Sequence, residues 1–154
     1  MTSLISGKKK IAIVMGAWHD ELVGQCREAF LGELKKHDVS IEDSIETIKV
    51  PGSFEIPLMI KDLAKSGKYV AFVAMGLVVN GGIYRHEFVA SAVIDGLMKV
   101  QLDLNLPVLS AVLTPINFHE HETHQEFFKR HLSYKGVEVA NSLVELLKIR
   151  SEVL

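Results

Sequence analysis

The sequence has few of the residues that mark special classes of protein. Its 154 residues include one cysteine, one tryptophan and four prolines. The single thiol, Cys26, cannot form an internal disulfide, and no apolar core follows the charges of Met1–Lys10 as it would in a signal sequence. We therefore expect a cytoplasmic protein.

Long apolar runs and a strong net charge are also lacking. No run reaches the roughly 18–20 apolar residues that cross a bilayer. The formal net charge is −2, and the only basic run, Lys8–Lys10, is too short to follow a phosphate backbone. We expect neither a membrane nor nucleic acid as a partner, which leaves small molecules and other proteins.

What is present fits one ordinary globular domain. The chain is 48% hydrophobic and 23% charged, without internal repeats or low-complexity segments. At this length folding typically buries roughly 68–70% of the surface of the unfolded chain, so stability requires no structural metal. We expect a single domain over residues 1–154, with residues 1–9 as a disordered or extended arm.

Apolar runs that stop at glycine or proline alternate with segments of helical spacing. The predicted strands are Ile11–Met15, Ser44–Val50, Tyr69–Met75 and Pro107–Leu113. The predicted helices cover about residues 20–36, 54–66, 83–104, 121–131 and 135–149. This alternation predicts an α/β protein, a flavodoxin-like three-layer αβα sandwich with a four-stranded parallel sheet and helices on both faces.

In such a sheet, ligands bind beyond the carboxyl ends of the strands. The loops that fall there are Gly16–Asp20, Val50–Pro57, Gly76–Val89 and Thr114–His124. We expect these loops to meet at one edge of the sheet.

The segment 83–104 is apolar over more than one face, because Ile94 and Met98 lie off its main stripe. Such a helix is either deeply buried or packed against a second subunit. We favour the second interpretation and expect a homo-oligomer.

Val50–Pro57 runs from a predicted strand into a helix. Free backbone N–H groups at Ser53, Phe54 and Glu55 can bind ligand oxygens there. The Glu55 carboxylate can accept from hydroxyl groups, so the loop suits a polyol. Alternatively, Pro-Gly is a plain turn and Glu55 an ordinary charge of the first helical turn.

Gly76–Val89 matches neither Walker A nor the dinucleotide fingerprint. Its Gly81-Gly82 pair precedes a helix and permits an anion to approach backbone N–H groups, to which Arg85 can add a bidentate contact. A flexible turn is the alternative. Trp18 follows the first strand, where its indole can stack on a flat heterocycle unless it belongs to the core.

Several histidines follow the last predicted strand, namely His119, His121, His124 and His131. No His-Glu-x-x-His motif accompanies them, so we expect no metal site. They fit an anion-binding rim or a solvated helix start.

In order and spacing these segments resemble the lumazine synthase family, over nearly the whole chain from Ile11 to about Leu147. Val50–Pro57 is the most specific part of the match. Trp18 and the run Gly-Gly-Ile-Tyr-Arg-His resemble the second-type lumazine synthases of some bacteria.

The resemblance implies a transferase that needs no cofactor. Enzymes of this family condense 5-amino-6-(D-ribitylamino)uracil with 3,4-dihydroxy-2-butanone 4-phosphate to 6,7-dimethyl-8-ribityllumazine, the penultimate step of riboflavin biosynthesis. The resemblance also implies self-association into pentamers and, for the second type, decamers of two pentamers.

By position, the resemblance assigns stacking on the pyrimidine to Trp18 and the ribityl chain to Ser53, Phe54 and Glu55. The edge of the heterocycle and one further substrate contact are assigned to Leu77, Val78, Val79 and Ser110.

At the phosphate end, the resemblance assigns Gly82 and Ile83 as backbone donors and His124, from a neighbouring subunit, as the basic ligand. Arg85 departs from the family, because it stands at the position of the proton-donating histidine. Arginine stays charged up to a pH of about 12 and cannot donate a proton near neutrality. The adjacent His86 is therefore a second catalytic candidate beside Arg85, although neighbours on a helix point about 100° apart.

The missing histidine leaves other functions open. The chain could be a non-catalytic paralogue that binds a lumazine or a flavin, or a structural shell protein that uses only the oligomer.

Overall fold

The computed structural model describes residue 5 and residues 8–80, 85–115 and 122–154, with the side chains of 122–125 excepted. The chain forms a parallel sheet in the order β2-β1-β3-β4. The strands are β1 (Lys10–Gly16), β2 (Ile45–Val50), β3 (Tyr69–Leu77) and β4 (Val108–Leu113). The helices are α1 (Asp20–Lys36), α2 (Ile41–Ser44), η1 (Ser53–Glu55), α3 (Ile56–Ala64), α4 (His86–Leu104) and α5 (Glu122–Val153).

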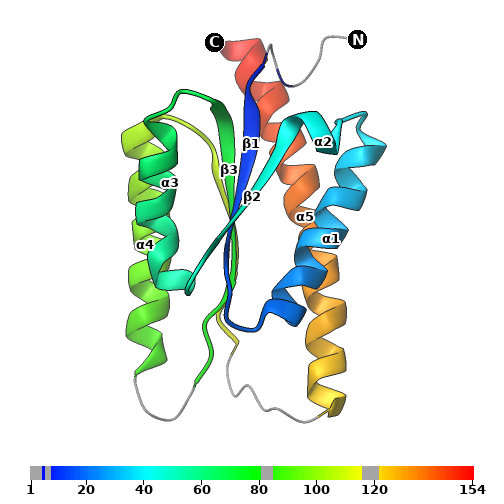
Figure 1. Ribbon diagram of the computed structural model, residues 1–154, viewed down its shortest axis with the longest axis vertical. Coiled ribbons are helices and arrows are strands. Elements are labelled where there is room, and N and C mark those ends of the chain that lie inside the picture. The colour runs from blue at the N-terminus through cyan, green and yellow to red at the C-terminus, as the bar shows by residue number, and fades with distance from the viewer. Residues whose placement is uncertain (1–4, 6–7, 81–84, 116–121) are drawn as a thin grey trace.

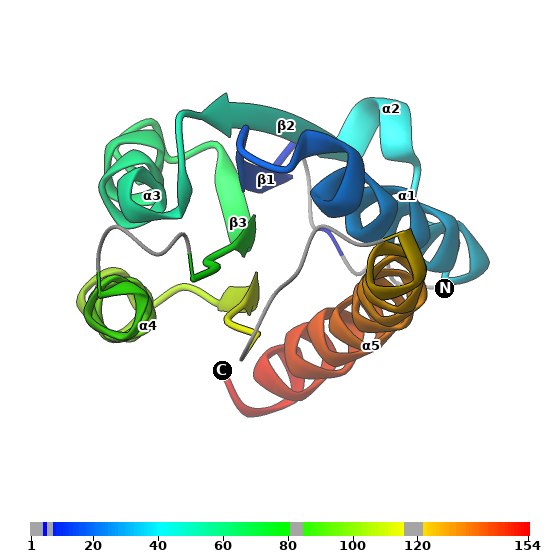
Figure 2. The same cartoon turned by 90° about the horizontal axis from the view of Figure 1, so that it is seen from below.

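Helices cover both faces of the sheet, α1 and α5 on one side and α3 and α4 on the other (Figures 1 and 2). The central strands β1 and β3 are continuous apolar runs because both of their faces are buried. Alternate residues therefore enter different cores: Ile13 packs toward α1 and α5, and Val14 toward α3 and α4. The predicted α/β sandwich is confirmed.

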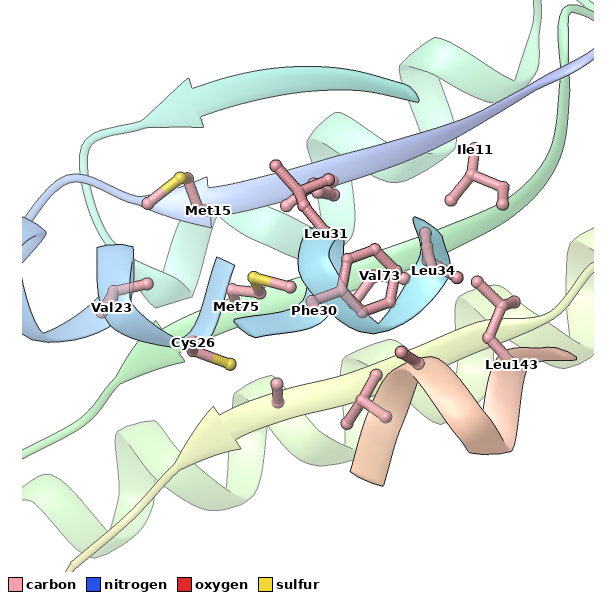
Figure 3. Close-up of a cluster of buried hydrophobic side chains, with 14 of the residues drawn as sticks. Ile11, Met15, Val23, Cys26, Phe30, Leu31, Leu34, Val73, Met75 and Leu143 are labelled. Carbon is pink, nitrogen blue, oxygen red and sulfur yellow. The ribbon is translucent and has the colours of Figure 1, made fainter. Parts of the chain in front are cut away.

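The larger core lies between the sheet and the α1–α5 pair (Figure 3). Phe30 and Leu34 of α1 meet Val73 and Met75 of β3 there, and each of the four side chains is fully buried. Cys26 belongs to the same core, where burial raises the pKa of its thiol to about 12. The thiol is therefore un-ionised and unreactive at neutral pH. Among the described residues, no helix is long and apolar enough to span a membrane.

The expectation of two helices at about 121–131 and 135–149 was wrong, because α5 is continuous through this region. Gly136 lies against α1, so closely that an added Cβ would overlap the carbonyl oxygen of Cys26 and lie 3.0 Å from the nitrogen of Phe30. This glycine permits close packing of two helices and does not end one. Buried Leu132 and Val139 continue the apolar stripe on either side.

Smaller differences occur at element ends. The helix expected from about residue 54 begins with the 3-10 turn η1, and the short helix α2 precedes β2 without having been predicted. The predicted N-terminal arm, 1–9, lies mostly outside the described residues.

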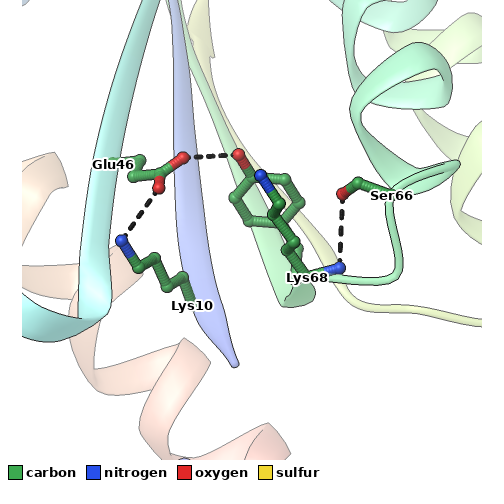
Figure 4. A network of polar contacts seen from close by, with 5 residues as sticks. Lys10, Glu46, Ser66 and Lys68 are labelled. Carbon is green, nitrogen blue, oxygen red and sulfur yellow. Dashed lines mark hydrogen bonds and ion pairs between the residues drawn. The ribbon is translucent and has the colours of Figure 1, made fainter. Parts of the chain in front are cut away.

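A polar cluster ties three strands together at their amino ends (Figure 4). The Tyr69 hydroxyl donates to one carboxylate oxygen of Glu46, and the ammonium of Lys10 donates to the other at 2.9 Å. These two donors lower the pKa of Glu46, while burial and the nearby carboxylate raise the pKa of Tyr69 to about 12. Near neutral pH the carboxylate is thus ionised and the phenol is neutral, so this end of the sheet is held by charge-assisted bonds.

The contact at Gly136 yields a prediction about stability. Gly136→Ala should destabilise the fold by about 1–3 kcal/mol, because the methyl group meets backbone atoms that cannot move aside. Gly32→Ala in α1 is the matched control, since that glycine is exposed with no atom within 4 Å of an added Cβ. Because alanine has a higher helix propensity than glycine, Gly32→Ala should stabilise the fold by roughly 0.5–1 kcal/mol. Denaturant unfolding at one protein concentration measures both variants, and an equal gain in both would refute the close contact.

Candidate active site

The carboxyl ends of the four strands meet at the lower edge of the sheet in Figure 1, which Figure 2 views directly. Strand β2 ends at Val50. The carbonyl of Val50 accepts a hydrogen bond of 2.8 Å from the N–H of Ala17, which directly follows β1. This bond places the turn after β2 beside the turn after β1.

The turn after β2 lies across the ends of β1 and β3. Ser53 is only 7% exposed, and its Oγ occupies the place where Gly76 would carry a Cβ. A Cβ on Gly16 would likewise lie 3.1 Å from the carbonyl carbon of Gly52. Because β1 ends in Gly16 and β3 has Gly76 as its penultimate residue, the turn can approach their backbones closely.

Glu55 closes the turn after β2 on itself. Its Oε2 accepts the N–H of Gly52 at 2.9 Å, and its own N–H donates to the carbonyl of Gly52 at 3.3 Å. The expectation of a free N–H at Glu55 was therefore wrong, because the turn forms as a 3-10 helix. The N–H groups of Ser53 and Phe54 precede its first bond, where helical donors lack a helical partner. The turn thus offers two donors and an exposed carboxylate.

Trp18 is 66% exposed and does not belong to the core. Its indole lies over the same turn: a Cβ on Gly52 would be 3.4 Å from Cε3 of Trp18. The next residue, His19, adopts a left-handed conformation (φ 58°) that turns the chain into α1. The structure therefore brings an accessible flat ring next to the polar groups of Ser53–Glu55.

Two ion pairs fix the start of α1 beneath Trp18. Asp20 pairs with Lys49 of β2 at 2.7 Å, and Glu21 pairs with Lys129 of α5 at 2.9 Å. Exposed pairs of this kind contribute little stability, but they connect the Trp18 turn to two neighbouring elements.

Most of the substrate-contacting residues predicted at the end of β3 are buried in the protein core. Leu77 and Val78 are buried on opposite faces of the sheet, Val79 is half-buried, and the N–H of Val78 donates to the carbonyl of Leu113 at 2.8 Å. Because these side chains are buried or half-buried, a ligand would contact the backbone of Leu77–Val79 more than their side chains. Ser110 is exposed on the edge strand β4, where its Oγ accepts the N–H of Val112 at 3.3 Å. It pairs with Ala74, two residues before Gly76, so it lies apart from Ser53 within one chain.

Arg85 and His86 begin α4 and share one carboxylate. Glu87 places Oε1 at 3.0 Å from Nε of Arg85 and Oε2 at 3.3 Å from Nδ1 of His86. The Arg85 guanidinium also lies 4.5 Å from the centre of the Phe88 ring. The pKa of Glu87 is lowered by the backbone N–H of Glu87 itself and, to a smaller extent, by the Arg85 guanidinium. Glu87 and Phe88 were not among the predicted site residues, although the opposite charges of Arg85 and Glu87 within one helical turn are visible in the sequence.

The predicted phosphate ligands Gly82 and Ile83 lie outside the described residues, as do His119 and His121. His124 falls in the first turn of α5, and its side chain is not among those described. Beyond it, His131 stacks on Phe127 beside an open hollow of about 350 Å³ at the end of β4. Within the described part of the chain, no three acidic, histidine or cysteine side chains gather as metal ligands.

Comparison with known proteins gives a consistent set of relatives. A family model described as 6,7-dimethyl-8-ribityllumazine synthase matches residues 8–151. A Bradyrhizobium diazoefficiens protein named 6,7-dimethyl-8-ribityllumazine synthase 2 is 50% identical over 94% of this chain and 88% of its own length. A Rhodococcus erythropolis 6,7-dimethyl-8-ribityllumazine synthase is 48% identical over 91% and 90%, and a synthase 2 of Pseudomonas syringae pv. tomato is 46% identical over 93% and 84%.

The contact between Gly76 and Ser53 generates a second prediction. Gly76→Ala should destabilise the protein, because the methyl group overlaps Ser53 Oγ and lies 3.3 Å from its Cβ. Ser53→Ala removes the overlapping oxygen, so the double variant should recover part of the loss, about 1 kcal/mol of coupling. Unfolding of the two single variants and the double variant measures this coupling. Strictly additive effects would show that the two residues do not touch.

Proposed function

Because the chain belongs to the 6,7-dimethyl-8-ribityllumazine synthase family, we propose that the edge formed by the turns after β1, β2 and β3 is its active site. The protein is a transferase of riboflavin biosynthesis. It condenses 5-amino-6-(D-ribitylamino)uracil with 3,4-dihydroxy-2-butanone 4-phosphate, and phosphate and water are lost as 6,7-dimethyl-8-ribityllumazine forms.

One observation carries the assignment of the first substrate. An exposed indole, two backbone donors and an exposed carboxylate lie on adjoining turns. The substrate has the matching parts, a flat pyrimidine and a chain of hydroxyl groups. Trp18 stacks on the pyrimidine, while Ser53 and Phe54 donate to ribityl oxygens and Glu55 accepts from ribityl hydroxyls.

The second substrate carries a phosphate, for which Arg85 at the start of α4 offers a cation. The guanidinium of Arg85 is largely exposed, with its side chain at 72% of full accessibility. We assign the phosphate to this end of the site, with Gly82, Ile83 and His124 as further ligands. Backbone N–H groups ahead of a helix and a fixed guanidinium are both suited to bind phosphate oxygens.

The chemistry requires alignment and proton transfer more than a protein nucleophile. The pyrimidine amine attacks the carbonyl of the second substrate, so no lysine imine is needed. Holding the two reactants together replaces a bimolecular encounter with a unimolecular step. In this arrangement the backbone of Leu77, Val78 and Val79 borders the heterocycle. Ser110 is kept as a further substrate contact, although it lies apart from Ser53 within one chain. Arg85 and His86 are the two catalytic candidates at this end, and of these the guanidinium stays charged near neutral pH.

An apolar stripe on α4 supports self-association. It consists of Phe88, Ile94, Met98 and Leu102, which share one third of the helix surface opposite buried Val93 and Val100. Met98 is 54% and Leu102 71% exposed, and an apolar face of this kind is typical of a subunit interface. We propose that α4 packs against further copies of the chain in a pentamer, and that two pentamers form a decamer.

The carboxylate of Glu55 can be tested through the substrate that it contacts. Glu55→Gln keeps the size of the side chain and an oxygen for the Gly52 N–H, but it weakens the bonds to ribityl hydroxyls. We expect KM for the ribitylaminouracil to rise by about 10-fold, the difference between a charged and a neutral acceptor, with KM for the phosphate substrate unchanged. Glu42→Gln, an exposed residue of α2, is the control. An unchanged KM in Glu55→Gln would remove Glu55 from the polyol site.

The α4 stripe can be tested by charge. Met98→Glu should lower the mass measured by sedimentation velocity from that of a pentamer or decamer toward the monomer, because a buried carboxylate at an interface lacks a partner. Ile149→Glu, which charges an exposed apolar residue of α5, is the matched control. A wild-type monomer, or equal dissociation of both variants, would contradict the proposed role of α4.

A further inference from the structure

Glu87 stands between the two candidate catalytic residues without having been assigned a role. Its Oε1 contacts Nε of Arg85 at 3.0 Å, and its Oε2 lies 3.3 Å from Nδ1 of His86. A single carboxylate therefore touches both the permanent cation and the titratable ring at the start of α4.

The carboxylate of Glu87 lies in the first turn of α4, where the helix dipole favours negative charge. Its own backbone N–H and then the Arg85 guanidinium lower its pKa. The side chain of Glu87 is 51% exposed, so its ion pairs contribute little to stability. Their consequence is orientation of the neighbouring side chains.

For His86, the contact decides which ring nitrogen remains available. A carboxylate beside Nδ1 favours the tautomer that carries its hydrogen there, because carboxylates accept and do not donate when ionised. Nε2 is then left to exchange a proton with a substrate. The imidazole side chain is only 24% exposed, which limits its alternative orientations.

For Arg85, the contact fixes one edge of the guanidinium. Nε contacts Glu87 and the guanidinium carbon lies 4.5 Å from the centre of the Phe88 ring, so two contacts restrain a side chain that is otherwise exposed. The two terminal nitrogens remain for an anion, and their donor geometry matches two phosphate oxygens.

We infer that Glu87 is a positioning residue that divides the work between its neighbours, so that His86 transfers the proton through Nε2 and Arg85 binds the phosphate or a carbonyl oxygen. This inference rests on the proposed active site. It adds a definite assignment of the proton to His86 and of fixed charge to Arg85.

Steady-state kinetics of Glu87→Gln tests the inference. The amide can still accept from Arg85 with its oxygen, but it then presents an NH2 donor to Nδ1 of His86 and favours the opposite tautomer. We expect kcat to fall by about 10- to 100-fold, which is less than the roughly 100- to 10,000-fold that a positioned acid or base contributes, because the ring is misoriented and not removed. KM for the butanone phosphate should change less than threefold. In a His86→Ala background the same change should lower kcat less than twofold, because Glu87 acts through the ring.

Asp103→Asn is the matched control, an exposed carboxylate at the other end of α4 with one cation, Lys99, at 2.8 Å. It should leave both parameters unchanged. An unchanged kcat in Glu87→Gln, or an equal fall in kcat in the wild-type and His86→Ala backgrounds, would overturn the inference. Neither result would affect the proposed function as long as the wild-type protein turns over its substrates. Absence of lumazine formation by the wild-type protein would instead refute the proposed function itself.

Discussion

The proposed site depends on a close approach that only glycine permits. Ser53 occupies the space of a missing side chain at Gly76, and the backbone beside it rests against Gly16. Strand ends with ordinary side chains would hold this turn away from the sheet. Its two amide donors and its carboxylate would then lie farther from the turn that carries Trp18, and the polar and flat parts of one ligand could not be bound together.

The same constraint operates between α1 and α5. Because Gly136 has no side chain, the backbone of α5 packs against the backbone of α1 at Cys26 and Phe30, and α5 continues past this contact as one long helix. The ion pair from Lys129 to Glu21 lies on this helix pair, in the first turn of α1, which begins two residues after Trp18. The packing of α5 thus bears on the position of a residue that is distant in sequence.

Patterns of apolar residues were sufficient to predict the four strands, the parallel sheet and the two helical layers, because burial on both faces leaves uninterrupted runs such as Ile11–Met15. These patterns did not predict features that depend on contacts between residues brought together only by the fold or on the exact form of a turn. Two helices were expected at about 121–131 and 135–149, because local propensity cannot reveal the neighbouring helix against which Gly136 packs. Glu55 was given a free N–H because a 3-10 turn and an α-helical start look alike in sequence. Residue types at the site could be named, but the contact of Glu87 with two neighbours required coordinates.

A fixed cation in place of a titrating group changes what the reacting end of the site can do. A guanidinium can neutralise phosphate or an oxyanion throughout the reaction, yet it cannot exchange the protons that imine formation and dehydration require. A neighbouring imidazole can exchange them, provided that its ring is oriented by a partner, as in sites where a carboxylate fixes one nitrogen of a histidine. Arg85 and His86 are adjacent at the start of a helix and therefore point in different directions. Because the Glu87 carboxylate contacts both side chains, it can hold the guanidinium and the imidazole at the same end of the site.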